Sequence, residues 1–232
     1  MRVLITNDDG IDAIGISALI KAVEKTCDVT IVAPMKSMSE CSHTITTRNP
    51  IRVEKIADNQ FSVDGSPADC VRLGLRGISE LKDCQFDWVL SGINQGGNLG
   101  VDRYLSGTVA GAREGTFLGV KSVAVSHYLK RSKSVDWDMA SSWFSQIWDK
   151  LVQSPPLDLH FFNINFPHLE SGSGLPELVE CQSDNLPLDI HFDQDGSGAY
   201  KYSGSYPDRL KHPGKDTDIC FNGSISLSQI PL

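Results

Sequence analysis

The sequence lacks the features that define several common functional classes. Basic residues are outnumbered, with 21 Lys and Arg against 29 Asp and Glu and a formal net charge of −8. Binding to the backbone of a nucleic-acid polymer needs a basic face, so such a partner is not expected. No apolar stretch approaches the roughly 20 residues of a membrane-spanning helix, and the chain starts with a strand-like run and not with a signal peptide. We therefore expect a cytoplasmic protein without a membrane partner.

Several sequence motifs are also missing. The six cysteines form no C-x-x-C pair, so we expect reduced thiols that act as small buried hydrophobes, and no zinc site. The glycine-rich stretch 92–100 does not fit G-x-G-x-x-G, and the chain contains neither G-x-x-x-x-G-K-[ST] nor G-x-S-x-G. A dinucleotide-dependent oxidoreductase is therefore the weakest of the alternatives considered, and a failure to bind NAD(H) would exclude it.

The elements that are present indicate an α/β fold. Hydrophobic residues make up 40% of the chain, enough for a sizeable core. Residues 3–6 form an apolar run typical of a strand buried on both faces. Helical spacing of apolar residues follows over 16–23, and 28–34 is a second strand that ends in proline. This unit implies two parallel strands with a right-handed crossover. We expect a Rossmann-like, mostly parallel sheet sandwiched by helices, with β-hairpin extensions.

The later part of the chain suggests where the core ends. Residues 51–56 and 60–63 are typical of a hairpin, and 157–166 has the pattern of the last strand of the sheet. Beyond Pro167 the periodicity fades and Ser, Gly, Pro and Asp become frequent. We expect residues 1–167 to form a Rossmann-like catalytic core and 168–232 a C-terminal arm of hairpins and loops. This arm would pack on the core and on a partner subunit, within a single domain overall.

Two neighbouring carboxylates, Asp8 and Asp9, follow the first strand directly. Open α/β sheets bind their ligands at the carboxyl ends of their strands. Two adjacent carboxylates oppose each other's ionisation unless a positive charge lies between them, and the next basic residue is Lys21. A divalent cation would supply that charge. The alternative is a solvated Asp-Gly turn with an aspartate that caps the next helix, and the pair alone does not decide between the two.

Two further polar loops follow strands of the same predicted sheet. One spans residues 35–47 and carries Ser39, and the other spans 91–100 and carries Asn94. If the strands are parallel, these loops and the Asp pair lie at one edge. Carboxylate, hydroxyl and amide oxygens suit a hard cation. We expect one divalent ion, Mg²⁺ or Mn²⁺, with these ligands: Asp8, Asp9, Ser39 and Asn94.

The stretch Ser106-Gly107-Thr108 precedes a helix and is a candidate anion site. A helix N-terminus presents unpaired N–H groups, the glycine allows close approach, and both hydroxyls can donate to a phosphate. The alternative is an ordinary helix cap. His43 lies in the 35–47 loop and can contact a phosphate or a water molecule; the alternative is a histidine with no role in the site.

These motifs, taken together, resemble those of a known family. The ordered series is similar to that of the SurE-type survival proteins, which are metal-dependent nucleotidases. The matching pieces run through most of the chain: Thr6-Asn-Asp-Asp-Gly-Ile11, Ala33-Pro34 with Ser39 and His43, Gly65-Ser-Pro-Ala-Asp-Cys70, Ser91-Gly-Ile-Asn94 with Gly96, Asn98 and Gly100, Ser106-Gly-Thr-Val109, and Asn163-Ile-Asn-Phe-Pro167. One departure is Ser42, which stands where a glycine usually precedes the histidine.

The resemblance implies a function and a set of site residues. It implies hydrolysis of nucleoside 5′- and 3′-monophosphates, with short polyphosphate as a further substrate, in a homodimer or homotetramer. It places the metal ligands at the four positions named above and the phosphate-side residues at Asn98 and at Ser106, Gly107 and Thr108. Asp8 and Asp9 are the expected catalytic residues. The alternative is a protein that binds or senses nucleotides without turnover.

Overall fold

The computed structural model describes residues 1–130, 133–188, 190–204 and 206–232. The elements follow one another along the chain in the order β1 (Arg2–Thr6), α1 (Ile14–Val23), β2 (Asp28–Pro34), β3 (Val53–Ala57), β4 (Gln60–Val63), α2 (Pro67–Arg76), η1 (Ser79–Leu81), β5 (Trp88–Gln95), η2 (Gly100–Tyr104), α3 (Gly107–Phe117), β6 (Lys121–His127), α4 (Trp137–Gln153), β7 (His160–Phe166), β8 (Leu178–Glu180), β9 (Phe192–Gln194), β10 (Tyr200–Tyr202), η3 (Tyr206–Asp208), α5 (Asp216–Phe221) and β11 (Ile225–Pro231).

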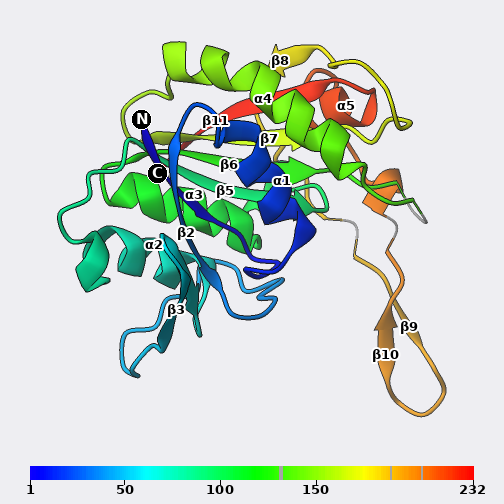
Figure 1. The fold of residues 1–232 in the computed structure, drawn as a ribbon. Coiled ribbons are helices and arrows are strands. Elements are labelled where there is room, and N and C mark those ends of the chain that lie inside the picture. Colours follow the sequence, from blue (N-terminus) through cyan, green and yellow to red (C-terminus); the bar gives the residue numbers. More distant parts are fainter. Residues whose placement is uncertain (131–132, 189, 205) are drawn as a thin grey trace.

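The described strands form one large sheet between two layers of helices. Nine of them pair in the order β3-β4-β2-β1-β5-β6-β7-β11-β8. From β4 to β7 the strands are parallel, whereas β3 and β11 are antiparallel to their neighbours β4 and β7. Helices α1 and α4 cover one face of the sheet, and α2 and α3 cover the other (Figure 1). The predicted α/β architecture is confirmed.

Strand β1 lies at the centre of this arrangement. Val3, Leu4 and Ile5 are fully buried. Val3 and Ile5 belong to the core on the α1–α4 side, and Leu4 belongs to the core on the α2 side. The apolar run is thus buried on both faces, as predicted. Because β2 and β5 flank β1 and run parallel to it, the loops that follow the three strands leave the same edge of the sheet.

The prediction that residues 157–166 hold the last strand of the sheet is wrong. Strand β7 pairs with β11, which in turn pairs with β8. Ser226 and Ser228 alternate with apolar residues along β11 and are themselves fully buried. Buried serines interrupt the apolar run by which a two-sided strand is recognised, so the sequence pattern resembles that of an exposed hairpin.

Residues 168–232 therefore contribute to two different structures. Strands β8 and β11 belong to the main sheet, whereas β9 and β10 form a separate hairpin that projects from the body (Figure 1). The aromatic side chains of Phe192, Tyr200 and Tyr202 on this hairpin are exposed. None of the helices in the described ranges is long and apolar enough to cross a membrane.

Candidate active site

Polar residues from the three loops line one cavity at the carboxyl edge of the sheet. Its volume is about 330 Å³. The structure brings together in its wall all four residues of the predicted cation set and two of the predicted phosphate-side residues: Asp8, Asp9, Ser39, Asn94, Asn98 and Ser106. This convergence follows from the parallel order β2-β1-β5, which places the three loops side by side.

Asp8 is the most deeply buried acid of the cavity. Its side chain accepts two hydrogen bonds from Thr108, one from the backbone N–H at 3.1 Å and one from the hydroxyl at 2.5 Å. Burial raises the pKa of Asp8 to about 6, and the charge of Asp9 adds to this rise, while the bonds from Thr108 oppose it. The ionised carboxylate is thus only partly compensated by the protein, which makes it a good ligand for a cation.

Asp9 and Asn94 present further oxygen atoms. Asp9 accepts a bond of 3.3 Å from the N–H of Gln95, and burial raises the pKa of Asp9. The amide nitrogen of Asn94 donates to the carbonyl of Gly96 at 2.9 Å, so its oxygen is the atom left for a ligand. The side chain of Asn7 closes the turn that carries the acids. Its amide nitrogen donates to the carbonyl of Gly10, and its oxygen accepts from the N–H of Gly10.

The position of Asn94 differs from the predicted one. We expected the glycine-rich stretch to be a loop from Ser91 onward, but β5 continues through Gln95. The pairing with β6 is irregular between Ser91 and Asn94. Asn94 is therefore held by a strand end and not by a free loop, which restricts its motion.

The first turn of α3 packs against Asp8 and holds its side chain in place. Ser106 caps the helix by accepting a bond of 3.1 Å from the N–H of Val109. A Cβ atom on Gly107 would lie 2.9 Å from Asp8 Cβ and 2.8 Å from Cys41 Sγ, so only glycine fits there. The hydroxyl of Thr108 points to Asp8. Gly107 and Thr108, which we predicted on the phosphate side, are not among the residues that line the cavity. Their contacts with Asp8 indicate that they position this side chain.

His43 is also outside the cavity wall. Its Nε2 lies 2.7 Å from the carboxylate of Glu114, its Nδ1 lies 3.2 Å from Arg113, and its ring stacks on Phe117. Burial alone would raise the pKa of Glu114, but the hydrogen bonds and charges of His43 and Arg72 outweigh burial and lower it. The structure thus places His43 in an ion-pair network beside the site and does not bring it to the predicted phosphate position.

Ser42 stands at the position where the family resemblance predicts a glycine. Its backbone has a φ of 52°, a left-handed conformation that favours glycine. The Ser42 hydroxyl donates to the carbonyl of Tyr104 at 2.7 Å, and its N–H donates to the carbonyl of Leu105 at 3.0 Å. These two bonds hold the 35–47 loop against the segment that precedes α3.

Sequence reasoning gave no role to the residues that hold Asn98. Its side chain donates to Ser126 at 2.8 Å, its N–H donates to Asn165 at 2.7 Å, and its carbonyl accepts from Asn163 at 2.9 Å. Asn163 and Asn165 are fully buried. Two asparagines at alternating positions of an otherwise apolar strand were a usable signal, because buried amides need partners.

The C-terminal part of the chain supports the same loop. The hydroxyl of Tyr206 contacts the carbonyl of Gly97 at 3.1 Å and the carboxylate of Asp102 at 2.9 Å. Asp216 accepts a bond of 2.9 Å from the N–H of Gly100. These contacts join positions more than a hundred residues apart, and no local pattern indicates them.

The donor set defines the class of site. Across the described chain, no three or more His, Cys, Asp and Glu side chains gather in a metal-binding arrangement. The cavity instead combines two neighbouring carboxylates with neutral oxygens beside a helix N-terminus. On an α/β sheet of this type, such a site has the chemistry to hold a hard cation together with an anionic ligand.

The chain belongs to the family described as "Survival protein SurE", whose profile matches residues 3–181. A relative from Nostoc sp. is 44% identical over 99% of both chains. A protein from Parvibaculum lavamentivorans named "5′-nucleotidase SurE" is 42% identical, over all of this chain and 86% of its own. The crystal structure of the SurE protein from Aquifex aeolicus superposes with a TM-score of 0.88 at 30% identity, covering 100% of this chain and 93% of that one.

Proposed function

We propose that this SurE-family 5′-nucleotidase hydrolyses nucleoside 5′-monophosphates to nucleoside and phosphate with the help of one divalent cation, Mg²⁺ or Mn²⁺. The observation that carries the proposal is the convergence of Asp8, Asp9, Ser39 and Asn94 on a cavity that Asn98 and Ser106 also line. The names of the curated relatives support the substrate class.

The residues of the cavity fit a hard cation. No Cys or His occurs among its lining residues, which offer carboxylate, hydroxyl and amide oxygens. Asp8 and Asp9 would supply the charge, and Ser39 and Asn94 would supply neutral oxygens. The cation, when bound, would place positive charge against the phosphoryl oxygens and increase the acidity of water.

The two acids have different roles in this mechanism. Asp8 accepts two bonds from Thr108, so its geometry is rigid and suits a metal ligand. Asp9 accepts one bond, from Gln95, which leaves an oxygen that would orient the attacking water and accept its proton. Asn98 and Ser106 would hold the phosphoryl group. The N-terminal end of α3 would stabilise the negative charge that develops there.

Phosphate release from AMP tests the proposal directly. We expect release with Mn²⁺ or Mg²⁺ and none in EDTA. The variant Ser39→Ala is expected to need a higher metal concentration for half-maximal rate. Ser37→Ala is expected to have a smaller effect, because Ser37 contacts Ser39 at 2.9 Å without lining the cavity. AMP that binds with metal present but is not hydrolysed would support the alternative of a nucleotide sensor.

The same assay decides the range of substrates. We propose that 3′-monophosphates and short polyphosphate are also hydrolysed, because the proposed contacts are all to the phosphoryl group and the cation, which these substrates share with 5′ esters. Rates on 5′-AMP, 3′-AMP and tripolyphosphate, measured at one metal concentration, test this point. Hydrolysis of 5′-AMP alone would restrict the substrate to 5′ esters.

We also propose a homodimer or homotetramer. The exposed aromatic residues of the projecting hairpin, Phe192, Tyr200 and Tyr202, offer apolar surface for a partner subunit. Sedimentation equilibrium of the intact chain is expected to give at least twice the monomer mass of 25.4 kDa. A monomer at micromolar concentration would contradict this.

Metal affinity is expected to depend on pH because protons compete for Asp8. In the metal-free protein the pKa of Asp8 is raised to about 6, so the carboxylate is ionised at pH 7.5 and mostly protonated at pH 5. We expect the Mn²⁺ dissociation constant to be constant above about pH 7 and to rise about tenfold per pH unit below 6, as one proton per ion is displaced. Isothermal titration calorimetry between pH 5 and 8 measures this, and a constant affinity down to pH 5 would contradict it.

A further inference from the structure

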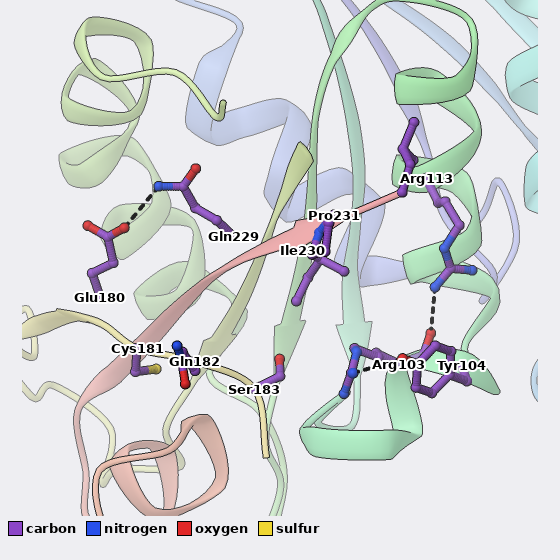
Figure 2. A pocket seen from close by; sticks show the side chains of 11 residues that line it. Arg103, Tyr104, Arg113, Glu180, Cys181, Gln182, Ser183, Gln229, Ile230 and Pro231 are labelled. Atoms are coloured by element: carbon purple, nitrogen blue, oxygen red, sulfur yellow. Dashed lines mark hydrogen bonds between the residues drawn. The ribbon is translucent and has the colours of Figure 1, made fainter. Parts of the chain in front are cut away.

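A second and larger pocket lies beside the Asp8 cavity and is separate from it. Its volume is about 790 Å³, and it has no lining residue in common with that cavity. It is bounded by the segment that runs from η2 into α3, by β11 and by residues 180–183 (Figure 2). The residues that matter for its chemistry are two arginines, Arg103 and Arg113, and the ring of Tyr104.

Among the described residues, neither arginine has an acidic hydrogen-bond partner. Arg113 donates to the carbonyl of Arg103 at 3.1 Å, as Figure 2 shows, and lies 3.2 Å from the His43 ring. Arg103 donates to the carbonyls of Gly100 and Asp184 and to the hydroxyl of Tyr104. All these partners are neutral acceptors or a ring nitrogen. Burial lowers the pKa of Arg113, and the nearby charge of Arg103 lowers it further.

The acidic side chain of the pocket, Glu180, does not pair with either arginine. Glu180 lines the pocket but accepts a bond of 2.9 Å from the side chain of Gln229. Within the part of the chain that the structure describes, neither arginine forms an ion pair with Glu180, with the carboxyl end at Leu232 or with any other acid. In a chain of net charge −8, two guanidinium groups that have no paired acid and share one concave site favour an anionic ligand.

Part of the remaining wall is apolar, beside the polar side chains of Gln182, Ser183 and Gln229. Ile230, Pro231 and Leu232 come from the end of β11. Tyr104 is 57% exposed, and the guanidinium of Arg103 lies over its ring, 4.4 Å from the ring centroid. Such a wall suits a planar or apolar group attached to the anion, because stacking and burial add to the charge interaction.

We propose that this pocket is a second, non-catalytic binding site for an organic phosphate, with the phosphate on Arg103 and Arg113 and a planar organic group against Tyr104 and Pro231. Guanidinium groups bind phosphate oxygens through paired N–H donors. The ligand class is therefore a nucleotide-like phosphate ester. The pocket adjoins the active site: Arg113 contacts His43 of the 35–47 loop, and Arg103 contacts Gly100 of the glycine-rich segment.

The test is a binding measurement on the intact, metal-free chain in EDTA, with AMP and inorganic phosphate as separate probes. Without metal the paired carboxylates of the catalytic cavity repel phosphate, and AMP is not hydrolysed. This readout is independent of phosphate release, so failure of the site and failure of the proposed function are distinguishable. We expect calorimetry to give one AMP site per chain, and at least tenfold weaker binding of inorganic phosphate because it lacks the organic group.

Two arginine variants and a matched control locate the site. Arg103→Met and Arg113→Met are expected to weaken AMP binding at least tenfold. Arg76→Met is the control, because the Arg76 guanidinium bonds to backbone carbonyls, has no acidic partner among the described residues and lies outside the pocket. Circular dichroism checks folding, and the two arginine variants provide independent tests. Absence of AMP binding to the wild-type chain, binding that survives in the folded variants, or equal affinity for AMP and inorganic phosphate would overturn the proposal.

Discussion

Replacing Asp8 with asparagine is expected to abolish phosphate release and yet to stabilise the metal-free protein. Activity is lost because an amide supplies no negative charge to a cation. The metal contributes several kcal/mol to transition-state stabilisation, so a loss of about 10³-fold or more in kcat/KM is expected. The fold is retained because the amide oxygen can still accept a hydrogen bond from Thr108, which holds the native carboxylate.

The gain in stability follows from the pKa of Asp8. In the folded protein it is raised from 3.8 to about 6, chiefly by burial. At a pH between the two pKa values, the folded state keeps a proton on Asp8 that the unfolded chain releases. The free energy of unfolding of the wild type therefore falls as the pH rises through this range. The loss is complete above about pH 7 and amounts to roughly 3 kcal/mol for two pH units. Asparagine has no proton to release and avoids this loss.

Urea unfolding in EDTA at pH 4.5 and 7.5 measures the effect. The stability difference between Asp8→Asn and the wild type is expected to be about a third of its full value at pH 4.5 and to reach the full value at pH 7.5. Asp9→Asn is the matched comparison: Asp9 is less buried, so a smaller gain in stability is expected with a similar loss of turnover. Two results would contradict the role given to this residue. One is activity of Asp8→Asn with Mn²⁺, and the other is a stability difference from the wild type that is the same at pH 4.5 and pH 7.5.

Gly15→Ala is expected to destabilise the protein more than a Gly→Ala substitution at any other helical position described. Gly15 lies in α1 where the helix crosses β5. A Cβ atom there would lie 2.0 Å from the carbonyl oxygen of Ile93 and 3.1 Å from the ring of Trp137. Neither a backbone carbonyl of a central strand nor a packed indole can move aside cheaply. The helix propensity of alanine offsets only about 1 kcal/mol.

We therefore expect a net loss of roughly 3 kcal/mol, which corresponds to a decrease of about 6–12 °C in Tm for a chain of this length. Because Ile93 precedes Asn94, the displacement would also reach a predicted cation ligand and raise the metal concentration needed for activity. Gly174→Ala is the control, since nothing lies within 4 Å of a Cβ atom at that position. Differential scanning calorimetry of both variants tests the prediction, and an unchanged Tm for Gly15→Ala would show that α1 does not pack closely on β5.

Local patterns were sufficient for the early part of the sheet and for the site that lies on it. The apolar run of β1, the Asp pair that follows it and the parallel order of β2, β1 and β5 together imply the shared edge at which six predicted residues meet. Periodicity failed at β11, where buried serines replace the expected apolar residues. It also failed at the end of β5, where an irregular ladder carries the strand beyond its apolar part.

The sequence by itself determined that oxygen donors of the early loops share one edge of a sheet, because a strand–helix–strand unit implies parallel strands whose carboxyl ends lie at the same edge. Only the tertiary structure decided which donors face the cavity. Thr108 turns to Asp8 and His43 turns to Glu114, because buried polar atoms must find partners wherever packing places them. The pairing of Tyr206 with Asp102 and the pocket of Arg103 and Arg113 likewise depend on contacts between residues far apart in the chain, which no local pattern encodes.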